Sequence, residues 1–428
     1  MMRSLYSGVS GLKVHQTKMD VIGNNISNVN TVGFKASRVT FSELFYQTTQ
    51  TATGSNAERG TGGQNAKQIG LGASLSSIAV DINTEGGSQS TNRPFDLKIN
   101  GDAFFIVQRT GATYFTKAGN FATDDFGNLV TDTGAYVMGY VADSVGGALQ
   151  TDQLRPISIY AKKYVNTVPE ATAASNFTGN ISKVDSNFAE GLPITRNIQV
   201  YDNLGYQYSV QVQISKVSDT EYSVTTNGVY SGTALVEGLT ATMDGTLTFD
   251  EATGLLTDDT VLDLSITGNE AFTVDPIKVD FSNITCYGTE STIDSARGAY
   301  DGTGAGKKVG VMTSVGIDTN GNVVAAYDNG DNEIIGQLAV TTFSNPSGLE
   351  KVGENMFGAT LNSGEFNGVG SDIATTGGSI TSGVLEMSNV DLASEFTDMI
   401  VTQRGFQANS RVITTSDTMI EELLSLKR

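Results

Sequence analysis

Apolar residues recur every three or four positions at both ends of the chain, a spacing that places them on one face of an α-helix. The N-terminal series has polar Gln16 in its one gap and runs through Leu5, Val9, Leu12, Met19, Ile22, Ile26 and Val29. The C-terminal series includes polar Gln403, Ser410 and Asp417 and runs through Leu392, Phe396, Met399, Phe406, Ile413, Ile420 and Leu424. Both ends are therefore predicted to form long amphipathic helices with a heptad-like apolar stripe.

Neither predicted helix could bury its stripe alone, since isolated helices are marginally stable in water without packing partners. We therefore predict that both series of residues pack between subunits, in an α-helical inner domain that resembles a coiled coil. The alternative is that both helices pack against the chain's own core. Gly8, Gly11 and Gly23 weigh against that alternative, because a polar stripe with several glycines makes a poor core, whereas small residues let neighbouring helices approach closely.

The interior of the chain shows a period of two, which is typical of strands with one buried and one wet face. The clearest case is residues 195–217, where a turn at 202–205 and an alternating series predict a hairpin. Its apolar members are Tyr206, Tyr208, Val210, Val212 and Ile214. Further strands are predicted at residues 95–99, 261–266, 277–281 and 337–343. The predicted fold class is therefore mainly β with long terminal α-helices and two or more β-rich domains.

Two similar Gly-Asn turns occur far apart, in residues 125–130 and 319–324. They indicate one β domain built from two distant segments with another domain inserted, although such turns also recur by chance in a Gly-rich chain. The tracts rich in Gly, Ser and Thr at residues 47–72 and 365–383 are typical of extended connectors. The predicted domains are a helical inner domain (1–30 and 388–428), a connector (31–70 and 362–387), a discontinuous β domain (71–145 and 288–361) and an inserted outer β domain (146–287).

Asparagine makes up four of the seven residues from 24 to 30, where the first helix must end. Asn tolerates left-handed dihedrals, and its amide can bond the carbonyl groups left free at a helix end. The predicted joint between helix and connector consists of Asn24, Asn25, Asn28, Asn30, Gly33 and Phe34. We interpret this cluster as a structural joint and not as a catalytic site.

Composition supports a β-rich protein and restricts its partners. The 428 residues include 49 glycines and only 6 prolines, and 39% of them are hydrophobic and 17% charged, which suits many tight turns. The formal net charge of −20 argues against a nucleic-acid partner and against adhesion to anionic membranes, because both require clustered Lys and Arg. The longest apolar runs are too short to span a bilayer, and the N-terminal residues lack the apolar core of a secretory signal.

Candidate chemistry is sparse. The one cysteine, Cys286, is expected to be a small buried side chain in a strand, and the one histidine, His15, argues against the usual zinc sites and catalytic triads. Residues 302–308 depart from a phosphate loop, because Asp301 and Lys308 stand where Gly and Ser or Thr are needed. Residues 318–333 resemble a calcium loop, but Val323 replaces its glycine, so a hairpin is expected. We predict no catalytic, cofactor-binding or metal-binding residues; a glycosidase carboxylate pair is the enzymatic alternative.

Three stretches carry a resemblance to a known family: SLYSGVSGL at residues 4–12, NNISNVNTVGFKASR at 24–38, and the long run at 388–424. They resemble the terminal signatures of the bacterial flagellar axial proteins, which form the rod, the hook and the hook–filament junction. Residues 95–140 resemble the domain shared by the distal rod and the hook. The long insert, with SNFTGNISK at 175–183 and VDFSNITCYGTEST at 279–292, is similar to that of the hook members.

The resemblance implies a structural subunit and not an enzyme. Such a subunit polymerises into the tubular hook, a universal joint that carries motor torque from rod to filament and encloses the export channel. The implied partners are further copies of the chain, the rod, hook-cap and junction proteins and the flagellar type III export apparatus, without cofactor, nucleic acid or membrane. The implied location is the extracellular hook and basal body, reached without a cleaved signal. The alternatives are a distal rod-like protein with a long insert and a surface β-rich adhesin.

Overall fold

The computed structural model describes residues 2–54, 60, 62–257, 261–268, 272 and 276–426. Parts of the predicted inner domain (1 and 427–428), connector (55–59 and 61) and outer domain (258–260, 269–271 and 273–275) lie outside the described residues. The chain divides into two compact units. The first consists of Met1–Ala161, Val315–Val324 and Ile334–Arg428, and the second of Lys162–Ser314 and Ala325–Glu333.

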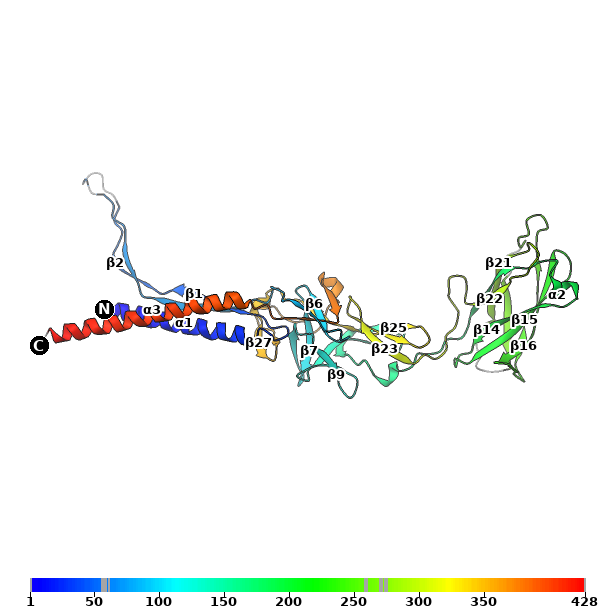
Figure 1. The fold of residues 1–428 in the computed structure, drawn as a ribbon, viewed down its shortest axis with the longest axis horizontal. Helices are drawn as coiled ribbons and strands as arrows, with labels where there is room; N and C mark the ends of the chain where they lie inside the picture. The colour runs from blue at the N-terminus through cyan, green and yellow to red at the C-terminus, as the bar shows by residue number, and fades with distance from the viewer. Residues whose placement is uncertain are drawn as a thin grey trace. The chain divides into compact units, whose positions relative to one another are not determined.

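The two terminal helices of the first unit, α1 (Met2–Ser27) and α3 (Leu392–Ser425), lie side by side (Figure 1). They are antiparallel, because Ser4 of α1 contacts Ser416 near the end of α3, while Asn25 contacts Glu395 near its start. The start of α3 is capped by Asp391, whose carboxylate accepts a hydrogen bond from the Ala393 amide. The prediction of long terminal helices is confirmed.

The β part of the first unit contains one large sheet and several short ladders. Within this unit the large sheet has the order β25-β11-β7-β8-β28-β27, and its core includes three phenylalanines, Phe104, Phe115 and Phe357. The ladders are the pairs β1–β4, β2–β3, β5–β30 and β6–β29. The predicted strand at 95–99 corresponds to β6, whereas the one at 337–343 is divided between β25 and β26.

The strand bounds in or adjoining the first unit are β1 Ser37–Glu43, β2 Tyr46–Gln50, β3 Lys67–Gly70, β4 Ala73–Val80, β5 Ser88–Ser90, β6 Leu97–Asn100, β7 Phe104–Arg109, β8 Ala112–Thr116, β9 Phe121–Thr123, β10 Leu129–Thr131, β11 Tyr136–Ala142 and β12 Leu149–Pro156. Later in the chain follow β23 Met312–Ile317, β24 Asn322–Tyr327, β25 Asn332–Leu338, β26 Val340–Thr341, β27 Glu350–Gly353, β28 Met356–Gly358, β29 Ser379–Ser382 and β30 Val384–Glu386. Strands β23, β24 and β25 contain residues of both units.

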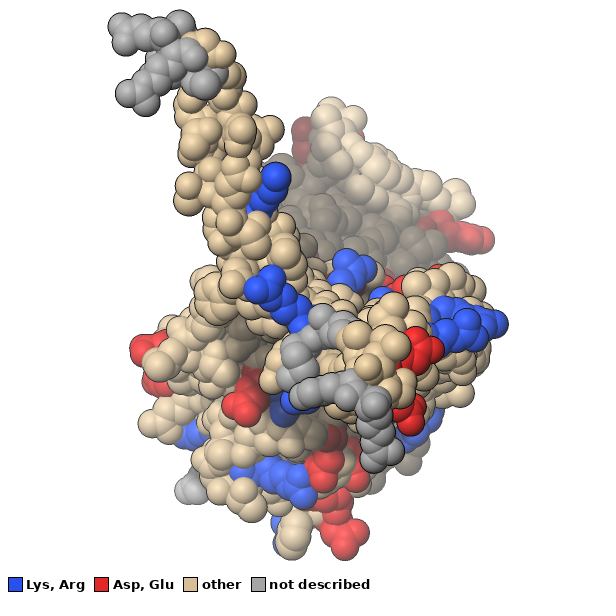
Figure 2. Space-filling model, turned by 90° about the vertical axis from the view of Figure 1, so that its left-hand side faces the viewer, with Lys and Arg blue, Asp and Glu red and all other residues tan. Residues whose placement is uncertain are grey.

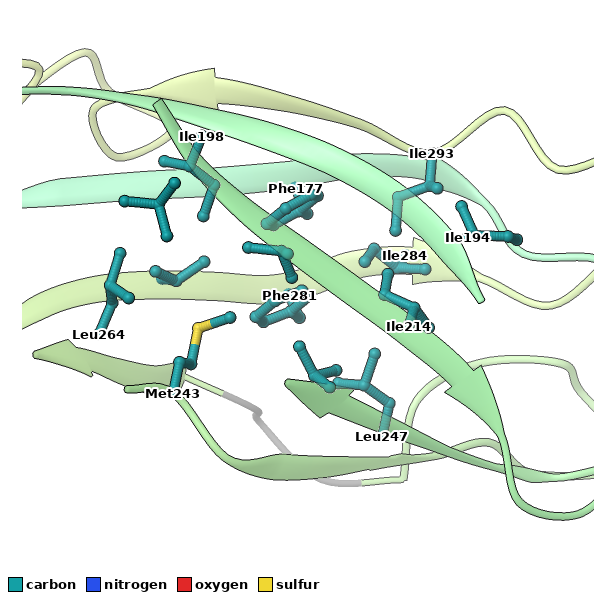
Figure 3. Close-up of a cluster of buried hydrophobic side chains, with 14 of the residues drawn as sticks. Phe177, Ile194, Ile198, Ile214, Met243, Leu247, Leu264, Phe281, Ile284 and Ile293 are labelled. Atoms are coloured by element: carbon teal, nitrogen blue, oxygen red, sulfur yellow. The ribbon is translucent and has the colours of Figure 1, made fainter. Parts of the chain in front are cut away.

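The second unit has two five-stranded sheets that share one apolar core (Figure 3). One sheet has the order β18-β20-β21-β13-β22; the other has the order β14-β15-β16-β17, with β19 beside β16. The strand bounds are β13 Ala174–Asn180, β14 Ile194–Tyr201, β15 Gln207–Lys216, β16 Glu221–Ser231, β17 Ala234–Leu235, β18 Thr240–Thr242, β19 Gly245–Thr248, β20 Val261–Thr267, β21 Ile277–Thr285 and β22 Asp294–Arg297, and a short helix, α2, spans Ser186–Ala189. Because both sheets contribute to the core, this unit is a β-sandwich.

The predicted hairpin at 195–217 is confirmed as the antiparallel pair β14–β15. Val210, Val212 and Ile214 are fully buried, but Tyr206 is exposed, contrary to its place in the predicted alternation. The reason is that Tyr206 closes the turn: its amide donates to the Asp202 carboxylate at 2.8 Å, so the strand begins only after it.

The Gly-Asn turns that suggested an internal repeat have the same hydrogen bonds. Asp124 and Asp318 each accept from the amides two and four residues later, and each also bonds the side chain of the Asn at the fourth position. Asp318 therefore stabilises the turn between β23 and β24, as the predicted hairpin requires. The likeness is one of turns, and it leaves both interpretations of the repeat open.

Candidate subunit interface on the terminal helices

The contact between α1 and α3 is made largely by small and polar residues. A Cβ added at Gly8 would lie 3.1 Å from Cγ1 of Ile413, and one added at Gly11 would lie 2.6 Å from Nδ2 of Asn409. Gly405 packs equally closely against the ring of His15, so glycines on both helices allow the approach. The α1 residues with such contacts are spaced by three, four or seven and form what we call the polar seam: Ser4, Gly8, Gly11, His15, Lys18 and Asn25.

Polar contacts continue the seam towards the start of α3. Lys18 Nζ lies 3.5 Å from Oδ1 of Asp398, and the Asn25 amide donates to Oε1 of Glu395 at 2.9 Å. Burial and the charge of Lys18 lower the pKa of His15, so its ring is more readily neutral in this contact. The two helices of one chain thus contact each other largely through small and polar groups.

The predicted packing residues mostly flank this seam and are incompletely covered. Among them Ile22 is buried, and Ile413 contributes to the helix contact through Gly8. The half-buried members are Leu5, Leu12, Met19, Ile26, Val29, Met399, Phe406, Ile413 and Ile420. The exposed members are Val9 (45%), Leu392 (39%), Phe396 (50%) and Leu424 (64%). Their role in subunit packing stays a prediction, but the chain alone leaves them available to neighbours.

A second apolar face of α3 was missed by the sequence prediction. Its residues are Val401, Val412, Met419 and Leu423, continued by Leu426 directly after the helix, and all five are exposed. The steps from 412 to 419 and from 419 to 426 are seven residues, which is the signal that could have revealed a second stripe. A groove beside this face is lined by Arg404, Gln407, Ala408, Arg411, Val412, Thr415 and Ser416. The helix therefore has apolar surface on more than one side.

The predicted joint has a defined geometry. Asn25 is buried, and its amide bonds both the carbonyl and the amide of Ser37, while the Asn28 side chain donates to the Asn24 carbonyl at the helix end. None of the four asparagines has a positive φ. Gly33 takes that conformation instead (φ 67°), and an added Cβ there would lie 2.7 Å from the Ala118 nitrogen, so both the backbone and the packing require glycine.

The remaining predicted joint residues differ in burial. Asn24 and Asn30 are exposed, whereas Phe34 is buried beneath the Lys351 ammonium, which lies 4.5 Å from the centre of its ring. The β27–β28 hairpin is hydrogen-bonded to residues 32–35. Lys351 donates to the Lys35 carbonyl at 2.7 Å, and Asn355 donates to the Val32 carbonyl at 3.0 Å. The chain that leaves α1 is therefore held by side chains distant in sequence.

An ion pair that the sequence did not reveal lies beside this joint. Lys35 and Glu386 are both 1% exposed, and Nζ lies 2.8 Å from Oε1. Nearby Lys117 is also buried and donates to the Gly101 carbonyl at 2.6 Å. Burial lowers the pKa of Lys117 to about 8; Glu386 opposes this shift and the charge of Lys35 adds to it.

Other sites for chemistry are few. Among the described residues no cluster of His, Cys, Asp or Glu could hold a metal ion. Cys286 follows β21 and is half-buried, not buried within a strand as predicted; its Sγ lies 3.7 Å from the Tyr222 hydroxyl. Burial, with a contribution from that contact, raises the pKa of Tyr222. In the described part of the chain, no helix has the length and apolarity to cross a membrane.

The β2–β3 hairpin also has an exposed surface, and this surface carries few charges. Figure 2 shows this projecting hairpin as mostly uncharged. Lys67 is the one charged residue among the described residues between 47 and 72. Exposed apolar side chains near its base include Phe45, Tyr46 and Ile69. This part of the predicted connector is therefore also weakly charged and partly apolar.

Four family models match successive parts of the chain. They describe the flagella basal body rod protein (residues 5–35), the flagellar hook protein FlgE/F/G D1 domain (98–178), the flagellar basal body protein FlaE D2 domain (169–299) and the flagellar basal body rod FlgEFG protein C-terminal region (381–426). The first and last of these contain most of α1 and α3, so the helices are part of what the chain shares with its relatives.

Whole-chain relatives agree with these matches. The flagellar hook protein FlgE of Treponema pallidum is 36% identical over 485 residues, and the flagellar basal-body rod protein FlgG of Bacillus subtilis is 31% identical over 428, each alignment covering 100% of both chains. A crystal structure of the Helicobacter pylori hook protein FlgE2 aligns at 13% identity with a TM-score of 0.46, covering 68% of this chain and 98% of that one. The chain therefore belongs to the FlgE/FlgG family of flagellar hook proteins, structural proteins of the flagellar hook and basal body.

Proposed function

We propose that this chain polymerises into a tubular hook through its terminal helices. The observation that carries the proposal is that the residues of α1 and α3 that join the helices within one chain differ from those that stay exposed. The polar seam joins the helices within one chain, while apolar residues such as Val9, Phe396 and Leu424 stay exposed. Exposed apolar side chains that line up along a helix mark an interaction site, and neighbouring copies of the same helices would cover it.

The second face of α3 supports a polymer of many helices and not a simple dimer. A helix with apolar residues on two sides can contact a neighbour on each, as in a tube with several subunits per turn. The 34 residues of α3 extend over roughly 50 Å at about 1.5 Å per residue, which gives a long contact. Each Å² of apolar surface removed from water contributes about 25 cal/mol, so partial exposure in one chain becomes a driving force for assembly.

The finer domain division belongs to the same proposal. We assign residues 1–30 and 388–428 to the inner polymerisation domain and residues 31–70 and 362–387 to the connector. Residues 71–145 with 288–361 form the discontinuous β domain, and residues 146–287 the inserted outer domain. The two compact units use other boundaries, so this division stays a prediction. In the tube, the helices enclose the export channel, and less apolar contacts between outer domains slide when the hook bends.

The proposed partners and route follow from the resemblance and not from the geometry. They are further copies of the chain, the rod, hook-cap and hook–filament junction proteins, and the flagellar type III export apparatus. Export without a cleaved signal places the polymer outside the cell, where it carries torque as a universal joint. We propose no enzymatic activity and no cofactor, nucleic-acid or membrane partner.

A rod subunit is the second candidate, because the Bacillus subtilis rod protein aligns over the full chain. The higher identity to a hook protein and the D2-domain match at residues 169–299 favour the hook. Electron microscopy of the purified full chain under assembly conditions tests the proposal. Tubes that bend and supercoil are expected; straight rigid tubes would favour the rod, and absence of tubes across a range of salt and pH would overturn polymerisation through these helices.

A further inference from the structure

Both terminal segments leave the β part of the first unit beside one buried ion pair, Lys35–Glu386. Lys35 stands two residues before β1, and Glu386 ends β30, shortly before α3. Replacing buried ion pairs by apolar residues is often neutral or stabilising, so stability alone does not explain such a pair. A fixed register between two segments is the better-attested role.

The pair connects three segments of the chain. The Lys35 ammonium also donates to the Thr84 carbonyl at 2.7 Å, and the Gly86 amide donates to the same Glu386 oxygen at 2.9 Å. The Glu386 carbonyl accepts from the Gly33 amide at 2.8 Å. A Cβ at Gly86 would lie 1.8 Å from the Met387 carbonyl oxygen, so the close approach requires glycine.

The backbone ladder at this point is short and its β5 side is polar, so the backbone pairing specifies the register only weakly. The one buried apolar side chain of β30 is Leu385. Strand β30 pairs with β5 over three residues, with Glu386 opposite Ser88 and Val384 opposite Ser90. All of β5 is exposed and polar, so it provides no apolar pattern that would oppose slippage. A slip of two residues preserves the faces of both strands, and it would bring Val384 or Ser388 to the place of Glu386. Lys35 would then be buried without its partner.

A change of register here would turn the helix that follows. Successive residues of an α-helix differ by about 100° around its axis, so a slip of two residues presents a different face at a given point of α3. The face of α3 that contacts the polar seam of α1 would then be replaced by another face of the helix. The register of this short ladder thus determines which surface the helix offers.

We propose that the Lys35–Glu386 pair fixes the register of β30 against β5, and thereby selects the faces of α1 and α3 that neighbouring copies of the chain meet. The inference rests on the proposed polymerisation for its consequence, but the register is a property of the single chain. The two residues act by positioning and make no contact with a neighbour themselves.

Disulfide trapping in the full-length chain with Cys286→Ser tests the register. Ser90→Cys/Val384→Cys reports the native register, and Ser88→Cys/Val384→Cys reports a slip of two residues. With the ion pair intact, the slipped pair should oxidise at least 100-fold more slowly than the native pair. In the Lys35→Met/Glu386→Gln background, where Gln retains an acceptor for the Gly86 amide, the ratio should fall below tenfold. Lys308→Ala, which removes the exposed contact to Asp328 in the second unit, is the control and should leave the ratio unchanged.

Hydrogen exchange provides an independent test of the register. Lys35→Met alone and Glu386→Gln alone should each raise exchange at least tenfold at both the Gly33 and Met387 amides, although each variant alters one segment. The proposal would be overturned if the rise in exchange were confined to the altered segment, or if the double variant did not change the trapping ratio. If the wild-type chain forms tubes but the double variant leaves the trapping ratio unchanged, the register role is rejected and polymerisation is not. If the wild-type chain forms no tubes but the double variant changes the ratio, only polymerisation is rejected.

Discussion

The β-sandwich of the second unit and the helix pair of the first unit differ in how far they bury their apolar side chains. In the sandwich, Ile214, Leu264 and Phe281 point into a shared core and are fully buried (Figure 3). In the helix pair, small and polar residues make the contact, and most of the regular apolar stripe is left half-buried or exposed. Similar periodic patterns therefore serve a domain that is complete by itself and a surface that requires neighbours.

The first prediction tests the helix side of this comparison and has the largest expected effect. Phe406→Asp places an unpaired charge in the apolar surface that neighbours are proposed to cover, which costs several kcal/mol at every repeated contact. Polymer should be lost, while the β-sheet circular dichroism of the monomer is unchanged. Thr414→Asp, at an exposed polar position of the same helix, is the control and should still assemble. Unfolding of the Phe406→Asp monomer would instead place Phe406 in the chain's own core.

The second prediction tests the sandwich. Phe281 is fully buried and stacks on Phe177 with the ring centres 4.7 Å apart. Phe281→Ala should lower the free energy of unfolding of the second unit by about 3–5 kcal/mol, because it removes buried surface and leaves a cavity. Chemical denaturation followed by circular dichroism measures this loss. Leu204→Ala, at an exposed position in a turn of the same unit, should change it by less than about 0.5 kcal/mol; equal losses would contradict the assigned core.

The third prediction concerns the joint, where charges are buried. The pKa of Lys117 falls from 10.5 to about 8 on folding, so between those values the unfolded chain binds a proton that the folded chain has released. The free energy of unfolding of the first unit should therefore rise with pH across this window, by at most about 3 kcal/mol. Lys351, whose pKa burial also lowers, contributes in the same direction. The groups that act on Lys117 are Glu386, Lys35, Asp102 and Glu85.

Denaturation at closely spaced pH values from 7 to 10 measures this rise. Lys117→Met should flatten most of it and should raise stability at neutral pH, because the buried charge is gone. Lys13→Met, at an exposed position of α1, serves as the control for removing a positive charge. A wild-type curve that falls across the window, or one that Lys117→Met leaves unaltered, would show that the Lys117 charge is well solvated.

Local periodicity predicted the elements better than it predicted their contacts. The terminal helices and the β14–β15 hairpin follow from steps of three or four and of two, because such patterns reflect which face an element buries. The polar seam was noticed only as glycines unsuited to a core, and the second face of α3 was overlooked. Packing between two specific helices depends on side-chain shapes at positions such as Gly11 and Asn409, which no one-dimensional pattern contains.

The buried charges at the joint show a second limit. Lys35 and Glu386 lie 351 positions apart, and each alone reads as an ordinary surface charge. Only the fold brings them together, so their burial is not visible from local sequence. The asparagine cluster was more informative: its position at a helix end predicted a joint, but the left-handed residue there is Gly33, which avoids the Cβ clash with Ala118.

The last prediction has the smallest effect and concerns the charge that each added subunit brings. The formal net charge is −20, so packing copies into a tube brings like charges together. Screening over about 8 Å at 0.15 M salt weakens this repulsion, whereas at 0.01 M it extends to about 30 Å. Assembly, followed by light scattering, should therefore be slower in low salt and faster in moderate salt or mild acid, by a few-fold. The helix residues that neighbouring copies are proposed to cover are apolar, so salt should alter the rate more than the final tube. A critical concentration and rate that do not respond to salt between these limits would show that the charges of neighbouring copies lie too far apart to interact.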